Sequence, residues 1–313
     1  MKSLLFCLLL SLNVFAQNTP TKSADSKPAP IDVTSHYIDS ADPAIWLRAS
    51  LPPVRPNSRK HYLGQVQLQQ EGWLYYVSEV DHHSLDAKNL LIAVTNPDRS
   101  DALCRGREEM IIQFGEGRPW WPRLSEYGYH VRKGDRLKLD IKFDNPKSTE
   151  IHDGNITIVF LFQPIDSGAF RRDVYPLWFD TKGCGPSEYD LKPGKNIASG
   201  SFEMSLDGSL VALQGSLRDL GQQLVVENAT RGQELLNTSI NPMPTAKPAT
   251  SADWHLAQGD MVSISATYDN PEKHDLKMAA TGIALGLFVP TDPAAVDSLD
   301  KHKVEDARPR ASQ

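Results

Sequence analysis

The chain has 313 residues, of which 8% are aromatic, 22 are proline and 20 are glycine, and its formal net charge is -6. An acidic surface repels phosphate backbones and anionic lipid headgroups, which argues against nucleic acid or an anionic membrane as a partner. The many turn-forming residues favour an all-β protein, and the length allows two domains that each bury a core.

The N-terminus is typical of a secretory leader. Lys2 precedes an apolar run at residues 4–12 that is too short to span a bilayer, and residues 14–16 match a small-residue cleavage signal. Residues 1–16 are therefore expected to be a signal peptide, and the polar, Pro-rich residues 17–35 a disordered lead-in. No later apolar run reaches membrane-spanning length, so we expect a secreted or luminal protein without a membrane anchor.

One strand pattern occurs twice along the chain. Gly134-Asp135 and Gly259-Asp260 each open a strand that ends in Asp-Asn-Pro, and each position is displaced by 125 residues (134 to 259, 146 to 271). Apolar side chains at every second position mark a strand with one buried face. The repeat predicts two copies of one β domain, which we place at residues 36–164 and 177–290.

Polar segments are expected to join and follow these two domains. Residues 165–176 form the connection, and residues 291–313 form a charged tail in which residues 294–304 could hold one short helix.

The cysteines and sequons agree with a secretory protein. Cys7 leaves with the leader, and two cysteines in an oxidising compartment usually pair, so we expect a disulfide between Cys104 and Cys184, with two buried free thiols as the alternative. Short sequons also arise by chance. The candidate glycosylation sites are Asn155, Asn228 and Asn237.

Three motifs occur in a characteristic order: Asp81-His82-His83-Ser84, Leu103-Cys104-Arg105-Gly106 and Glu126-Tyr127-Gly128-Tyr129-His130-Val131. In this order the chain resembles the two-domain copper type II, ascorbate-dependent monooxygenases, the family of peptidylglycine α-hydroxylating monooxygenase and its stress-nodulin-like relatives. The resemblance covers residues 60–290. It implies two β-sandwiches of jelly-roll type packed side by side.

The resemblance also implies a copper on three histidines in one domain. His82 and His83 match the first two ligands, although adjacent strand residues point to opposite faces and the pair could equally be an exposed strand end. The third ligand would fall near Lys142, and a protonated lysine does not bind copper.

The second implied copper site, on a His-x-His pair and a methionine, is also degenerate. Ser216 and Arg218 stand where the two histidines would be, which leaves only Met278 or its neighbourhood. A thioether alone does not hold copper against competing ligands. We therefore expect a protein without bound metal or another cofactor.

A cleft between two β domains is a common place for a small-molecule site. The profile of leader, sequons, double β domain and absent cofactor motif is similar to that of the fungal hetero-Diels–Alderases of tropolone-sesquiterpenoid pathways. This similarity implies dehydration to a quinone methide and cycloaddition with a terpene alkene, by positioning and exclusion of water. The expected catalytic residues are His82, which should lie beside Lys142, and Arg218; the expected substrate-binding residues are Trp73, Tyr76, His83 and Trp254.

Other functions remain open at this point. They are a copper monooxygenase with unrecognised ligands and a non-catalytic secreted binding protein; a homo-oligomer is open as well. No Gly-x-Ser-x-Gly elbow occurs, which argues against nucleophilic hydrolysis. Trp120 and Trp121 could line a ligand cleft or plug a sandwich core.

Overall fold

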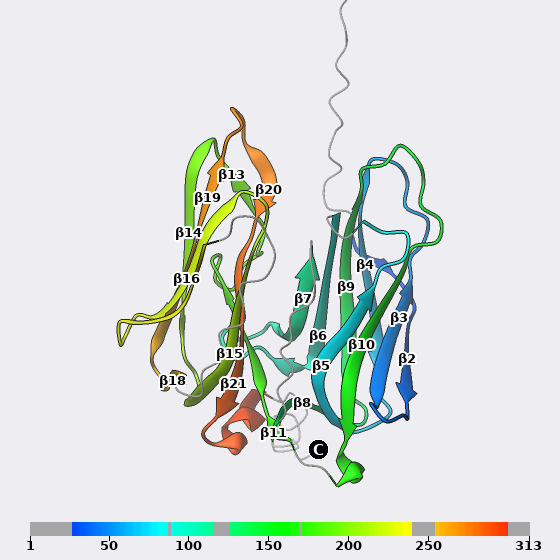
Figure 1. Ribbon diagram of the computed structural model, residues 1–313, viewed down its shortest axis with the longest axis vertical. Helices are drawn as coiled ribbons and strands as arrows, with labels where there is room; N and C mark the ends of the chain where they lie inside the picture. Colours follow the sequence, from blue (N-terminus) through cyan, green and yellow to red (C-terminus); the bar gives the residue numbers. More distant parts are fainter. Residues whose placement is uncertain (1–26, 87–88, 116–125, 169–170, 240–253, 300–313) are drawn as a thin grey trace, which may run out of the picture.

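The computed structural model describes residues 27–86, 89–115, 126–168, 171–239 and 254–299 (Figure 1). Apart from short 3-10 turns such as Ile165–Ser167 (η2) and Pro293–Leu299 (η3), its elements are strands, which confirms the all-β class. Within these ranges no helix is long and apolar enough to cross a membrane. The jelly-roll type of the sandwiches stays a prediction. The leader and Trp120-Trp121 lie outside the described residues.

The first sandwich consists of a five-stranded and a six-stranded sheet around one hydrophobic core. The order of the first sheet is β1 (Ala29–Pro30), β4 (Ser58–Gln67), β9 (Arg136–Asn145), β6 (Leu90–Ser100) and β7 (Glu108–Gly115). The order of the second is β11 (Arg172–Asp173), β8 (Tyr127–Val131), β5 (Gly72–Asp81), β10 (Asn155–Pro164), β3 (Ala44–Ser50) and β2 (Val33–Ile38).

The second sandwich consists of two four-stranded sheets around a second core. One sheet has the order β14 (Gly194–Glu203), β19 (Met261–Asn270), β16 (Gly221–Asn228) and β17 (Gln233–Ser239). The other has the order β12 (Tyr175–Asp180), β21 (Gly282–Pro290), β15 (Gly208–Leu217) and β18 (Trp254–Leu256). A separate pair is formed by β13 (Tyr189–Leu191) and β20 (Leu276–Ala280).

The two sandwiches repeat the same strand order. β4-β9-β6-β7 corresponds to β14-β19-β16-β17, and β3-β10-β5-β8 corresponds to β12-β21-β15-β18. The turn before the repeated strand also recurs: Asp135 accepts the N–H of Arg132 at 3.0 Å, and Asp260 accepts that of Ala257 at 2.9 Å. Each aspartate follows a glycine with positive φ, +98° and +86°, a conformation that costs glycine little.

Both ends of the folded region differ from the sequence prediction. Ala29 and Pro30 pair in parallel with β4, and β2 pairs with β3, so the first sandwich begins at Ala29 rather than at residue 36. The proline-rich composition conceals the inward-facing positions of β2, which alternate with exposed ones. In the predicted tail, η3 overlaps the short helix that residues 294–304 could hold, and it packs Val296 into the second core, so the second sandwich extends beyond residue 290.

The sandwiches meet through the sheet containing β7 and the sheet containing β12 (Figure 1). Trp178 and Ile283 form an apolar contact with Met110 there. The predicted Cys104–Cys184 disulfide is present and links a loop of the first sandwich to the turn after β12. Both cores are therefore held in contact covalently and by packing.

Candidate functional site between the two sandwiches

A pocket of about 260 Å³ lies between the two sandwiches. The first sandwich lines it with β4, β6, β7 and β9, and the second with β12, β15, β20, β21 and the segment before β13. Its charged lining residues are Arg59, Lys142, Asp144, Glu188, Arg218 and Lys277. Its larger apolar lining residues are Leu90, Leu91, Phe143, Trp178, Leu217, Met278 and Ile283. The pocket thus combines ionic and apolar walls.

The alternation of β9 places Lys142 in this pocket. Every second residue of the strand, from Leu137 to Phe143, is buried in the first core. Lys142 therefore projects from the opposite face, where the pocket lies. Across the sheet it is paired with His61 on β4 and Leu91 on β6.

Glu188 bridges the two sandwiches inside the pocket. Its Oε2 lies 3.4 Å from Nζ of Lys142, and its Oε1 lies 2.8 Å from Nη2 of Arg218. The glutamate side chain is only 6% exposed. A buried carboxylate needs such partners, because an unpaired charge in this position would be strongly destabilising. Arg218 is itself fixed by its backbone N–H, which donates to the Tyr268 hydroxyl at 3.0 Å.

Met278 lies in the pocket wall with an unusual backbone. Its φ is +49°, in the left-handed region, which costs a non-glycine residue about 1–3 kcal/mol. Three polar groups hold it: Arg218 Nη1 donates to its carbonyl at 2.7 Å, Asp190 accepts its N–H at 2.8 Å, and Arg59 Nη1 lies 3.6 Å from its sulfur. The strained residue therefore sits where both sandwiches contribute to the pocket.

The structure brings together two of the three expected catalytic residues. Lys142 and Arg218 share the pocket and contact the same carboxylate. His82 does not line it: β5 belongs to the other sheet, and His82 Nδ1 contacts the Leu85 carbonyl at 3.1 Å. His61, rather than His82, stands opposite Lys142.

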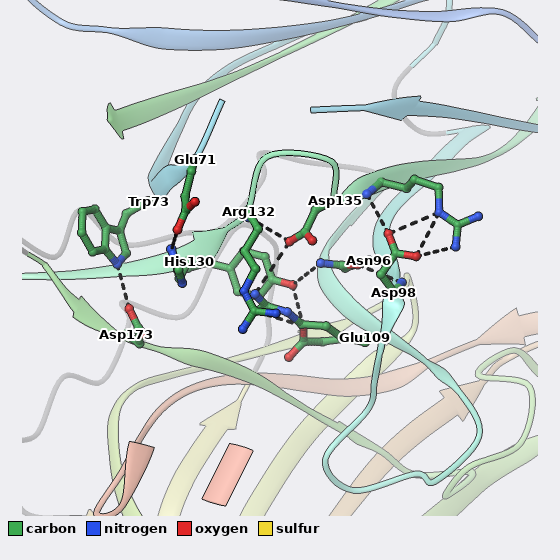
Figure 2. A network of polar contacts seen from close by, with 12 residues as sticks. Glu71, Trp73, Asn96, Asp98, Glu109, His130, Arg132, Asp135 and Asp173 are labelled. Carbon is green, nitrogen blue, oxygen red and sulfur yellow. Dashed lines mark hydrogen bonds and ion pairs between the residues drawn. The ribbon is translucent and has the colours of Figure 1, made fainter. Parts of the chain in front are cut away.

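The four expected substrate-binding residues also lie elsewhere in the fold. Trp73 is buried and donates through Nε1 to Asp173 at 2.7 Å (Figure 2). His83 is exposed, Tyr76 lies on β5, and Trp254 packs against the second core. None of the four lines the pocket: Trp73, Tyr76 and His83 lie on or just after β5, in the sheet of the first sandwich that does not contain β7, and Trp254 begins β18 at the edge of its sheet.

The side chains at the implied copper positions do not fit that metal. Lys142 and Arg218 are engaged with Glu188, and the Met278 thioether faces the Arg59 guanidinium, a cation that opposes a second cation beside it. In the part of the chain that the structure describes, no group of three or more His, Cys, Asp and Glu side chains could hold a metal ion.

Glu188 and Arg59 were not predicted as site residues. Glu188 belongs to no periodic pattern, but it follows Cys184 by four positions. Because the disulfide ties this segment to the first sandwich, the closeness of Glu188 to Cys184 in the sequence was the one indication that Glu188 lies near the junction of the sandwiches.

A second polar site lies inside the first sandwich (Figure 2). We call Asn96, Arg99, Glu109, Tyr129 and Asp135 the buried charge cluster, since all are at least 94% buried, with exposed fractions of 0–6%. The Tyr129 hydroxyl donates to Glu109 at 2.5 Å and accepts from Asn96 at 3.0 Å. Arg99 lies 3.9 Å from Glu109 and 3.7 Å from Asp135. Burial raises the pKa of Glu109 to about 7, despite the opposing effects of Arg99 and Tyr129.

Part of this cluster recurs in the second sandwich. Asn228 donates to Asp260 at 2.8 Å, and Arg231 Nε lies 2.9 Å from the same carboxylate. The sequences Asn96-Pro97-Asp98-Arg99 and Asn228-Ala229-Thr230-Arg231 therefore form a second repeated motif that the sequence analysis missed. The strand registers pair Asn96 with Glu109 and Asn228 with Gln233, so the buried glutamate is specific to the first sandwich.

The same geometry corrects one glycosylation prediction. Asn228 is fully buried, and its amide nitrogen, the atom that a glycan would occupy, donates to Asp260. A glycan there is incompatible with the fold. Asn155 and Asn237 are exposed, and their glycosylation stays a prediction.

Comparison with known proteins adds no further constraint on the pocket or the cluster. No protein-family model and no curated protein matches the chain.

Proposed function

We propose that this chain is a secreted enzyme that acts on a small, oxygen-bearing organic molecule in the pocket between the sandwiches, without redox chemistry. The observation that carries the proposal is the bridge of Lys142, Glu188 and Arg218. Fixed cations polarise a carbonyl or enol oxygen, and a carboxylate between them accepts a proton. Leu91, which is paired with Lys142 across the sheet, and Trp178 line the same pocket and supply apolar surface for the carbon skeleton.

For the reaction itself we propose a hetero-Diels–Alder type. Lys142 donates a proton to the hydroxyl of a hydroxymethyl precursor, which leaves as water, while Glu188 takes the proton of the ring hydroxyl. The product is a quinone methide. It then forms one C–C and one C–O bond with a terpene alkene, and no electron enters or leaves. Proton transfer from Glu188 back to Lys142 restores the site.

The apolar wall supports the second half of this reaction. Trp178 and Ile283 come from the second sandwich and Leu91 from the first, so an alkene and a diene could be held between walls of different origin. Holding two reactants in one orientation, away from water, is the main requirement of a cycloaddition catalyst.

The test is conversion of a hydroxymethyl-tropolone with a cyclic sesquiterpene alkene, without added metal or ascorbate. We expect turnover by the wild type and a loss of about a hundredfold or more in Lys142→Ala, Arg218→Ala and Glu188→Gln. Lys138→Ala is the matched control: it lies on the same face of β9, pairs with Glu108 at 2.9 Å and is outside the pocket. Its turnover should equal that of the wild type.

Two results would contradict the proposal. If the wild-type protein converted the substrates no faster than buffer alone, the cyclase function would be wrong and a non-catalytic binding protein would be favoured. Turnover that required copper and ascorbate would instead favour the monooxygenase.

A further inference from the structure

We infer that the pocket between the sandwiches recognises an organic carboxylate, and that Glu188 occupies the place of this group when no ligand is bound. The inference rests on the pocket of the proposed function and names a class of anion that it binds besides the tropolone substrate, because a carboxylate in the place of Glu188 would displace the base that the proposed reaction uses. It does not depend on which reaction follows.

The local charge favours an anion. The lining contains the cations Arg59, Lys142, Arg218 and Lys277 against the carboxylates of Asp144 and Glu188, a balance of +4 and -2. Asp190 and Asp275, which lie 2.7 Å and 3.9 Å from Lys277, bring the total to zero, and the excess of positive charge is at Lys142 and Arg218, which share one carboxylate. The whole chain has a net charge of -6, so these two cations with one carboxylate between them form a locally positive site on an acidic protein. Such sites concentrate small anions from solution.

The contacts of Glu188 show which group fits. A carboxylate reaches one cation of each sandwich at 3.4 Å and 2.8 Å. The fit is incomplete, because Glu188 Oε1 approaches Arg218 without the alignment of a hydrogen bond and has no other donor. A ligand carboxylate that aligns with the guanidinium fork would make the stronger, bidentate contact.

The position of Glu188 also permits exchange. It lies between β12 and β13, outside any strand, so its displacement breaks no strand pairing. Lys142 is 38% exposed and Arg218 is 22% exposed, so both cations can be approached from the pocket. Leu91 and Trp178 line the pocket beside them and suit a flat apolar group attached to the carboxylate.

The experiment is calorimetric titration of the full mature protein with benzoate, with benzamide as the uncharged probe of the same shape and sulfate as the inorganic anion. We expect benzoate to bind more tightly than either. Glu188→Gln should bind benzoate about fivefold more tightly, since it removes the competing charge, and Lys142→Ala and Arg218→Ala about fivefold more weakly. Lys138→Ala should match the wild type.

Several outcomes would overturn the inference. Equal affinity for benzamide and benzoate would show that the pocket does not recognise the charge. Equal affinity for sulfate and benzoate would show that it does not recognise the organic group. If Glu188→Gln bound benzoate with unchanged or lower affinity, and its unfolding midpoint were unchanged, Glu188 would not compete with the ligand carboxylate. Because binding is measured without turnover, a failed cyclase assay leaves this test unaffected, and failed benzoate binding leaves the cyclase assay unaffected.

Discussion

Glu109 in the first sandwich and Gln233 in the second occupy equivalent positions, opposite Asn96 and Asn228 on the neighbouring strands. The amide of a glutamine cannot ionise. The Glu109 carboxyl can, but its side chain is 1% exposed, and burial away from water disfavours the charged form. Burial is the main reason that its pKa is raised.

This carboxyl should make stability depend on pH. Its pKa rises from 4.5 to about 7 on folding, so the native state binds the proton more tightly than the unfolded chain. The free energy of unfolding should then fall as pH rises through this window, by on the order of 3 kcal/mol. Burial also raises the pKa of Asp101 and Asp180, which act in the same direction. Urea unfolding on both sides of the window measures the change.

Glu109→Gln should flatten most of this pH dependence, because it removes the group responsible. The control is Glu234→Gln on the exposed part of β17, which should leave the slope unchanged. Equal slopes in the two variants would show that Glu109 does not carry the effect.

Asn228 gives a second prediction for a single residue. Asn228→Ala removes the amide that Asp260 accepts and should lower the free energy of unfolding by about 1–3 kcal/mol. Asn237→Ala, at an exposed site, should change it by less than about 0.5 kcal/mol. Glycopeptide mass spectrometry of protein from a eukaryotic secretory host should find Asn228 without a glycan. A folded, glycan-bearing Asn228 would contradict the buried position.

At the scale of elements, period-two patterns predicted strands well. β9 and β19 span Arg136–Asn145 and Met261–Asn270, where the sequence repeat placed them. The same pattern does not tell which sheet a strand joins, so it could not correct the expectation, taken from the resemblance, that His82 and His83 after β5 lie at the cleft. β1 and β2 were missed because their composition resembles a linker.

The pocket was predictable only in part. Lys142 and Arg218 were identified through positions implied by a resemblance, and both line the pocket. Glu188 could not be identified in this way, because a residue in an irregular segment carries no periodic signal and its contacts depend on how the two sandwiches pack. The strained backbone of Met278 is likewise a property of the tertiary structure.

The disulfide is the element that fixes the segment carrying Glu188. Cys104 and Cys184 are 80 residues apart, and closing a loop of this length stabilises a protein by about 4 kcal/mol in the entropic account. The double variant Cys104→Ser, Cys184→Ser should lower the free energy of unfolding by a comparable amount in urea titrations.

A milder variant of the same junction is the comparison for this prediction. The Ser205 hydroxyl donates to the Ala102 carbonyl at 2.8 Å, so Ser205→Ala loosens the junction without cutting the tether and should cost about 1 kcal/mol. Non-reducing peptide mapping that found both thiols free would refute the pairing.

For the whole molecule, the residues at the implied ligand positions predict how much copper the protein retains. Lys142 and Arg218 stand at positions that the resemblance assigns to metal ligands, and neither donates a lone pair while protonated. Tag-free protein that is loaded with copper and desalted should retain much less than one copper per chain by elemental analysis. Two coppers per chain would show that the implied sites still bind metal and would favour the monooxygenase function.

The two hydrophobic cores exchange residues, and this limits how the molecule can move. Ala102 and Cys104 of the first sandwich are buried in the second core, while Ala212 and Leu287 of the second are buried in the first. A hinge motion that swung the sandwiches apart would withdraw these side chains into water and strain the covalent link between them. If the pocket binds the ligand that we propose, the ligand should enter through rotamer changes of Lys142 and Glu188 in a rigid frame, on timescales far shorter than those of domain closure.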